Sequence, residues 1–186
     1  MHFFSGAPVT YIHIFDDEKT VASSIFALKE GTSLPLHDHP NMHGFIKCIS
    51  GKVLIKSYSK IWEKTFTGNT PNSKIDLQAS GDYSHQRLRV GASRLPDMIL
   101  TEDDSEAASL QPEQGNIHSV TAIDGPAAFI DFLAPPYSND GQHTCHYFQV
   151  ESSDHVNDVH TLLEIGCPSW YWCAYAPYIG PQVHFC

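Results

Sequence analysis

The sequence is poor in basic residues and has no long apolar run. Only 11 lysines and arginines stand against 21 acidic residues, which gives a formal net charge of −10 over 186 residues. No basic cluster could follow a phosphate backbone, so we expect no nucleic-acid partner. No stretch approaches the roughly 20 apolar residues of a membrane helix, and the start lacks the pattern of a secretory leader. We expect a soluble monomer of the cytoplasm, with the nucleus as an alternative location and no membrane partner.

The sequence also lacks the cysteine spacing of a disulfide framework. Its five cysteines are odd in number, irregularly spaced and without a Cys-x-x-Cys pair, so neither a disulfide scaffold nor a structural zinc site is expected. At 186 residues the chain is large enough to bury its own core, and we expect residues 1–186 to form a single domain.

Short β-branched and aromatic runs, punctuated by Gly, Pro, Asn and Asp, predict many short strands and few helices. This pattern favours an all-β barrel or sandwich. Residues 63–86 are polar and turn-rich, and we expect a long excursion at a barrel edge. Residues 97–109 could hold a short helical turn capped near residues 101–104. The main expected strands are residues 11–15, 21–28, 34–39, 44–49, 52–58, 87–90, 114–122, 127–133 and 145–150.

Residues 34–44 (LPLHDHPNMHG) hold two histidines, His37 and His39, beside an apolar run. On a β-strand, residues i and i+2 share a face, so the two imidazoles could hold one metal ion. Turn residues 112–115 then precede His118 at the start of another apolar segment. Together these segments resemble the two half-motifs of the cupin superfamily, which implies a double-stranded β-helix (jelly-roll) barrel. The alternative is that the histidines are unrelated surface residues.

Four blocks resemble a narrower family, the thiol dioxygenases that include cysteamine (2-aminoethanethiol) dioxygenase and the plant cysteine oxidases. The blocks are residues 34–44, 116–118, 125–137, and 145–147 with 177–181. Residues 63–110 match little. The resemblance implies iron(II) held by three histidines, His37, His39 and His118, with O2 as co-substrate and a sulfinic acid as product. General cupins have a glutamate where this chain has His43, which is consistent with a three-histidine site.

Four further residues are candidates for chemistry. Asp131 is the only charge in the apolar run 127–133, and a carboxylate there needs a partner; the resemblance places it and Tyr137 near the substrate, where Asp131 would bind an ammonium group. Both could instead be structural. Cys145 and Tyr147 are two residues apart, so on a strand they would share a face. In the cysteamine dioxygenase branch the matching pair is linked as a thioether; the alternative is an ordinary packed pair.

The leading hypothesis is therefore an iron(II)-dependent thiol dioxygenase. Its partners would be O2 and a small aminothiol, an N-terminal cysteine of peptides or proteins, or both, and an oxygen-sensing role would follow from the latter. Another metal-dependent cupin enzyme, or a non-catalytic cupin that binds a ligand, remains open at this point. The sequence does not decide which thiol is preferred.

Overall fold

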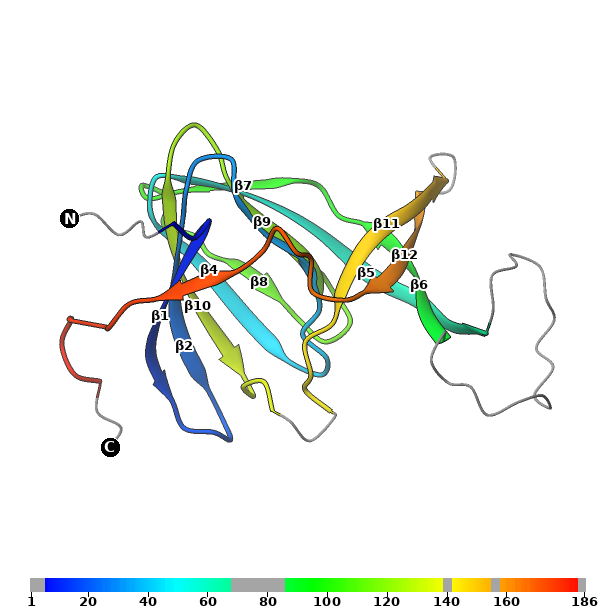
Figure 1. Cartoon of the computed structure of the whole chain (residues 1–186), viewed down its shortest axis with the longest axis horizontal. Helices are drawn as coiled ribbons and strands as arrows, with labels where there is room; N and C mark the ends of the chain where they lie inside the picture. The colour runs from blue at the N-terminus through cyan, green and yellow to red at the C-terminus, as the bar shows by residue number, and fades with distance from the viewer. Residues whose placement is uncertain (1–5, 68–85, 139–141, 155–157, 184–186) are drawn as a thin grey trace.

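The computed structural model describes residues 6–67, 86–138, 142–154 and 158–183, and within these ranges it is built from strands and contains no helix (Figure 1). The expected all-β fold is confirmed. The strands are β1 (Val9–Asp16), β2 (Ala22–Leu28), β3 (Ser33–His37), β4 (His43–Ser50), β5 (Lys52–Thr67), β6 (Gln86–Arg94), β7 (Met98–Thr101), β8 (Ala108–Leu110), β9 (Ile117–Ala122), β10 (Ala127–Ala134), β11 (Tyr147–Asp154), β12 (Val159–Ile165) and β13 (Cys173–Tyr175).

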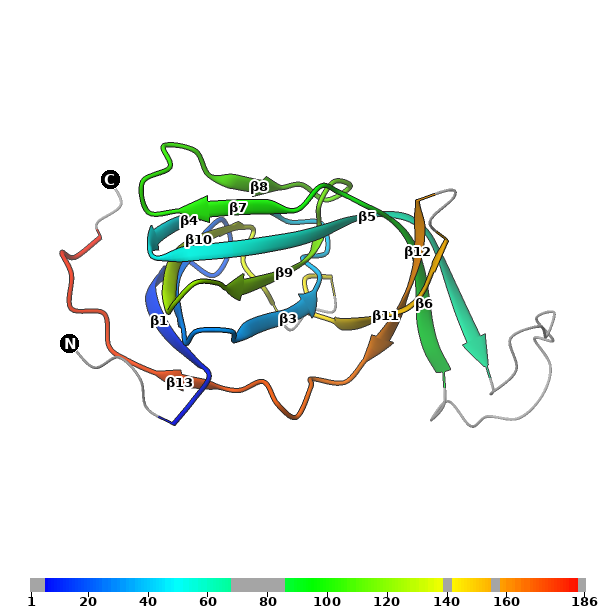
Figure 2. The same ribbon diagram turned by 90° about the horizontal axis from the view of Figure 1, so that it is seen from above.

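Two sheets face each other and form a cupin-type double-stranded β-helix barrel (Figure 2). One sheet has the order β13-β1-β2-β10-β4-β8, and the other has the order β6-β12-β11-β3-β9-β5-β7. All neighbouring strands are antiparallel except β1 and β13. Across the described residues, no helix has the length and hydropathy that crossing a membrane would require.

The barrel interior holds the main hydrophobic core. Strand β10 lies between β2 and β4 and alternates between its two faces, so Phe129 and Leu133 point inward. Phe129 is 1% exposed and stacks on Phe26 of β2 with ring centroids 5.3 Å apart. The residue between the two inward side chains, Asp131, shares their face because strand side chains alternate with period two. The sequence of β10 thus directs one carboxylate toward the barrel interior.

The far end of β5 forms an arm with β6, β11 and β12. Strand β5 pairs with β9 up to Tyr58 and continues against β6 as far as Thr67. A second core cluster, which includes Tyr58, Val90 and Leu162, fills this part of the molecule. The expected edge excursion at residues 63–86 is therefore wrong at both ends, where strands occur, because pairing continues beyond the barrel. Its remainder, residues 68–85, lies outside the described residues.

The expected helical turn in residues 97–109 is also wrong. This segment contains β7 and β8 instead, and β7 pairs with the first part of β5. The Asp104 carboxylate accepts hydrogen bonds from the backbone N–H and the hydroxyl of Thr101, at 2.6 and 3.0 Å. The acidic cluster therefore closes a turn between two strands, because sheet pairing outweighs the local helix-capping preference.

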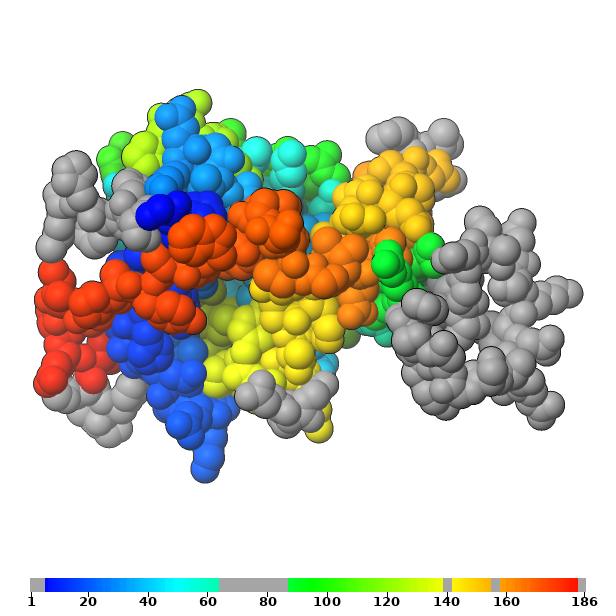
Figure 3. All heavy atoms as spheres, in the orientation of Figure 1, coloured from blue at the N-terminus to red at the C-terminus, as the bar shows by residue number. Residues whose placement is uncertain are grey.

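The segment after β12 crosses the outside of the barrel to reach β13 beside β1 (Figure 3). It carries Tyr171, which packs near Tyr147 with ring centroids 6.2 Å apart. This crossing brings Cys167 toward Tyr147 at the start of β11.

Candidate metal centre

The three histidines predicted as ligands come together in the barrel. His37 and His118 are direct cross-strand partners on β3 and β9, so their side chains lie on the same face of the sheet. His39 follows β3, and its ring lies 4.7 Å from that of His37 and 4.9 Å from that of His118, measured between centroids. One potential ligand atom from each residue lies within 4.8 Å of the others, and all three residues are buried. The arrangement could hold one metal ion.

The reason for the His37–His39 proximity differs from the expected one. Strand β3 ends at His37, so His39 does not lie on it and the period-two rule does not place its ring. Asn116 positions His39 instead. Its side-chain carbonyl accepts a 3.0 Å hydrogen bond from the His39 backbone N–H, and its side-chain amide donates a 2.7 Å hydrogen bond to the His39 backbone carbonyl. Asn116 is 5% exposed and precedes β9. No role for Asn116 was predicted from the sequence, although it lies two residues before His118.

Hydrogen bonds orient the rings. The Tyr137 hydroxyl lies 2.6 Å from the Asp38 carbonyl and 2.7 Å from Nδ1 of His39. Since a carbonyl can only accept, the hydroxyl proton goes to Asp38, and Nδ1–H of His39 donates to the phenol oxygen. The His37 Nδ1 lies 2.8 Å from the Pro35 carbonyl, so Nδ1–H donates there as well. In both rings Nε2 keeps its lone pair, which is the form that binds a metal.

The electrostatics of the cluster also fit a cation. Nε2 of His39 lies 3.3 Å from Nε2 of His118, while the His118 ring is also hydrogen-bonded to the Gly115 backbone. Burial lowers the pKa of His37, and it lowers the pKa of His39 and His118 well below the ordinary value, with the neighbouring histidines adding to the effect. The imidazoles are therefore neutral at pH 7, and two lone pairs face each other. A divalent cation between them would relieve that repulsion.

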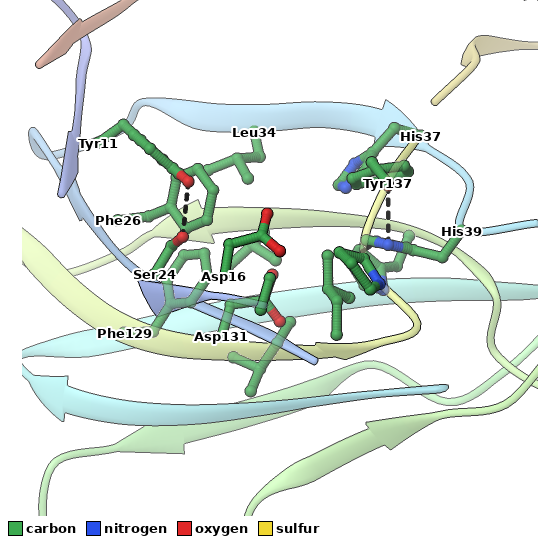
Figure 4. Close-up of a pocket in the computed structure, with 16 residues that line it drawn as sticks. Tyr11, Asp16, Ser24, Phe26, Leu34, His37, His39, Phe129, Asp131 and Tyr137 are labelled. Atoms are coloured by element: carbon green, nitrogen blue, oxygen red, sulfur yellow. Dashed lines mark hydrogen bonds between the residues drawn. The ribbon is translucent and has the colours of Figure 1, made fainter. Parts of the chain in front are cut away.

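The histidines line one end of a cavity of about 180 Å³. Figure 4 shows them at one end and the Tyr11–Ser24 hydrogen bond (2.7 Å) at the other, with Asp131 between. Asp131 is half-buried, and burial raises the pKa of its carboxyl group to about 7. Asp16, at the exposed end of β1, also lines the cavity; the sequence did not single it out. The cavity thus combines a metal-ligand cluster with carboxylates and apolar walls.

Cys145 and Tyr147 lie near each other, but not on one strand as expected. Strand β11 begins at Tyr147, and Cys145 precedes it. The Cys145 thiol lies near the phenols of Tyr137 and Tyr147 and interacts with both, and burial raises the pKa of that thiol to about 11. Cys145 therefore links the tyrosine beside His39 to the tyrosine that begins β11.

Hydrogen bonds between Asp38 and His146, which the sequence did not indicate, hold residues 145–147 against the histidine cluster. Asp38, between His37 and His39, points away from the cluster: its Oδ1 accepts the His146 N–H at 2.8 Å, and its own N–H donates to the His146 carbonyl at 3.1 Å. The neighbours of His146 are Cys145 and Tyr147. His43, in contrast, is exposed at the start of β4 and does not belong to the three-histidine group.

The chain is similar in sequence to proteins of known name. Human (Homo sapiens) 2-aminoethanethiol dioxygenase is 36% identical over 190 residues, covering 95% of this chain and 68% of the relative. Plant cysteine oxidase 1 of Arabidopsis thaliana is 34% identical over 146 residues, covering 77% of this chain and 42% of the relative. A solved Klebsiella pneumoniae protein with a double-stranded beta-helix domain matches with a TM-score of 0.45 and 14% identity, covering 76% of this chain and 85% of that one.

The family model PCO_ADO matches residues 4–183, which is nearly the whole chain. With this match and the relatives above, the family expected from the sequence is confirmed: the chain belongs to the PCO_ADO family.

Proposed function

We propose that this protein is an iron(II)-dependent thiol dioxygenase that converts a thiol and O2 into a sulfinic acid. Its substrate would be cysteamine, the N-terminal cysteine of a peptide or protein, or both. The observation that carries the proposal is the convergence of three neutral, buried imidazoles on a cavity that also holds Asp131. The names of the relatives, 2-aminoethanethiol dioxygenase and plant cysteine oxidase, support the same reaction class.

His37, His39 and His118 would hold the iron. Bound there, iron(II) would supply coordination positions for a thiolate sulfur and for O2, and would favour loss of the thiol proton. Among the described residues, none at the cluster is a strong base. None is required if bound iron(II) favours loss of the thiol proton. Both oxygen atoms go to sulfur, so the reaction RSH + O2 → RSO2H balances without an added reductant.

Asp131 supports a substrate with an ammonium group. Among the described residues that line the cavity there is no lysine or arginine, whereas two are aspartates, Asp16 and Asp131. An ammonium lies two carbons from sulfur in both cysteamine and an N-terminal cysteine, so a carboxylate facing the cluster could bind it in either. The carboxylate of free cysteine would have no cation to pair with, and free cysteine would be the poorer substrate. In a peptide that group is a neutral amide.

Tyr137 would keep the metal ligands in place. Its hydroxyl fixes the His39 ring, and burial raises the pKa of this phenol well above the ordinary value, with the Cys145 thiol adding to the effect. The phenol therefore keeps its proton at neutral pH and remains a hydrogen-bonding group. An oxygen-sensing role would follow if N-terminal cysteines of proteins are the physiological substrate.

The decisive experiment is mass spectrometry of cysteamine and of a peptide that begins with cysteine, after aerobic incubation with the iron-loaded protein. A gain of two oxygen atoms on either substrate, absent without O2, is the expected result. The same peptide with an acetylated N-terminus is the matched control, since it keeps the thiol and lacks the ammonium. Unchanged mass for both substrates, with iron bound, would contradict the proposal.

A further inference from the structure

Cys145 and Cys167 lie just beyond the ends of two paired strands, two residues before β11 and two residues after β12. The last pair of the antiparallel β11–β12 ladder is Tyr147 with Ile165, and its neighbour is Phe148 with Glu164. Continuing this register by two residues along each chain places Cys145 opposite Cys167. Directly opposed residues of an antiparallel pair have Cα atoms about 4.5 to 5.5 Å apart, which is within the range that a disulfide spans.

The side chains agree with the backbone register. The pKa of the Tyr147 phenol responds to the thiols of both Cys145 and Cys167, so the two sulfurs lie near the same hydroxyl. Both cysteines are free thiols in this structure; Cys167 is exposed and Cys145 is half-buried. A small oxidant can therefore reach Cys167 first, and Cys145 lies close enough to act as the resolving thiol.

We propose that Cys145 and Cys167 form a reversible disulfide, and that this disulfide and the Cys145–Tyr147 thioether exclude each other. A disulfide such as oxidised glutathione would be the oxidant: two protein thiols lose two hydrogens, one S–S bond forms, and two molecules of reduced glutathione leave. The Cys145 sulfur can make only one new bond besides its bond to Cβ. A molecule that carries the disulfide therefore cannot gain the thioether, and a molecule with the thioether cannot form the disulfide.

The disulfide would also change the surroundings of the histidine cluster. Cys145 interacts with Tyr137, which in turn is hydrogen-bonded to His39. The disulfide removes the S–H from this chain of contacts. Any effect on turnover rests on the proposed function, whereas formation of the bond does not.

Cys173 provides a matched control because it is a nearby thiol in a different place. Its Sγ donates to the Tyr171 hydroxyl at 3.2 Å, and it lies on β13 rather than opposite Cys145. If proximity alone decided pairing, Cys173 could replace Cys167. The register predicts that it does not.

The test uses the full chain, loaded with iron and kept anaerobic so that the thioether cannot form. The protein is equilibrated with oxidised and reduced glutathione, its free thiols are alkylated, and it is digested. No Lys or Arg follows Arg94, so trypsin leaves residues 95–186 in one piece. A protease that cleaves after glutamate instead separates residues 114–151, with Cys145, from residues 165–186, with Cys167, Cys173 and Cys186.

We expect the two peptides to be joined, with a mass two hydrogens below their sum, and to separate after treatment with a phosphine. Cys167→Ser should abolish the joined species and Cys173→Ser should keep it. Separate peptides at every glutathione ratio, glutathione held on Cys167 alone, or joining that persists in Cys167→Ser would each overturn the proposal. So would a joined peptide that also carries the thioether after prior aerobic turnover. Because the anaerobic arm involves no turnover, its failure is distinct from failure of the dioxygenase proposal.

Discussion

The Tyr137 hydroxyl lies 2.7 Å from Nδ1 of His39, on the side of the imidazole away from His118. This contact fixes which nitrogen of His39 carries the proton and which one is free to bind a metal. Tyr137 is 98 residues from His39 in the sequence, so the form of one proposed ligand depends on a residue from a distant part of the chain.

Tyr137→Phe tests this dependence. Loss of the hydroxyl leaves the His39 Nδ1–H without its acceptor, and removal of such a supporting partner typically weakens metal affinity or activity by about 10- to 100-fold. Titration of metal-free protein with iron(II) under anaerobic conditions measures the affinity. Tyr175→Phe, which alters an 82% exposed tyrosine, should bind iron as the unmodified protein does. Equal affinity in both variants would show that the contact does not support the ligand.

His118→Ala should remove most bound iron and abolish activity, since one of three ligands is lost. Elemental analysis of the purified variant checks the first result and substrate mass spectrometry the second. His43→Ala is the control: His43 is exposed and lies outside the three-histidine group, so iron content should remain at one per chain. A full complement of iron in His118→Ala, or its loss in His43→Ala, would refute the ligand assignment.

Asp131→Asn should lower kcat/KM for cysteamine and for peptides with an N-terminal cysteine. A charge-assisted hydrogen bond contributes about 1.5 to 3 kcal/mol, which corresponds to a loss of roughly 10- to 100-fold. Iron content should hardly change. Asp16→Asn removes an exposed carboxylate that lines the cavity, where solvent screens the charge, and should have a smaller effect. Full activity of Asp131→Asn with iron retained would mean that the ammonium is bound elsewhere.

The stability of the metal-free protein should depend on pH through Asp131. Burial raises the pKa of this carboxyl group from 3.8 to about 7, so between these values the folded protein binds more protons than the unfolded chain. Its contribution to stability is present in full below pH 3.8 and is lost as the pH rises to about 7. The Asp131→Asn variant does not lose stability in this way, because asparagine does not titrate in this pH range. The difference in Tm, variant minus unmodified protein, should therefore increase between pH 4 and 7, and a constant difference would contradict the expectation.

The Cys145–Tyr147 thioether is a separate prediction. After aerobic turnover, the peptide of residues 114–151 should lose two hydrogens in a fraction of molecules, because the thiol contacts the phenol near the proposed iron. Fragmentation of that peptide localises the change. Cys145→Ser should show no loss, whereas Cys167→Ser should retain it. An unchanged peptide after many turnovers would exclude the thioether.

The sequence by itself determined the family, the barrel and the histidines that meet in it. Alternating apolar residues and turn residues specify strands through local geometry. Local patterns failed where pairing between distant segments decided the outcome. Strand β5 extends to Thr67 because β6 pairs with it, and the acidic residues near Asp104 close a turn between strands.

Only the tertiary structure decided how the centre is held. His39 leaves its strand and is placed by Asn116, 77 residues away, and its proton is fixed by Tyr137. Cys145 precedes β11, and only the β11–β12 register, continued two residues beyond its last pair, suggests Cys167 as its neighbour. These relations depend on which strands become neighbours and in what register. Sequence periodicity reports only the face on which a residue lies, and not the distant residue that it will meet.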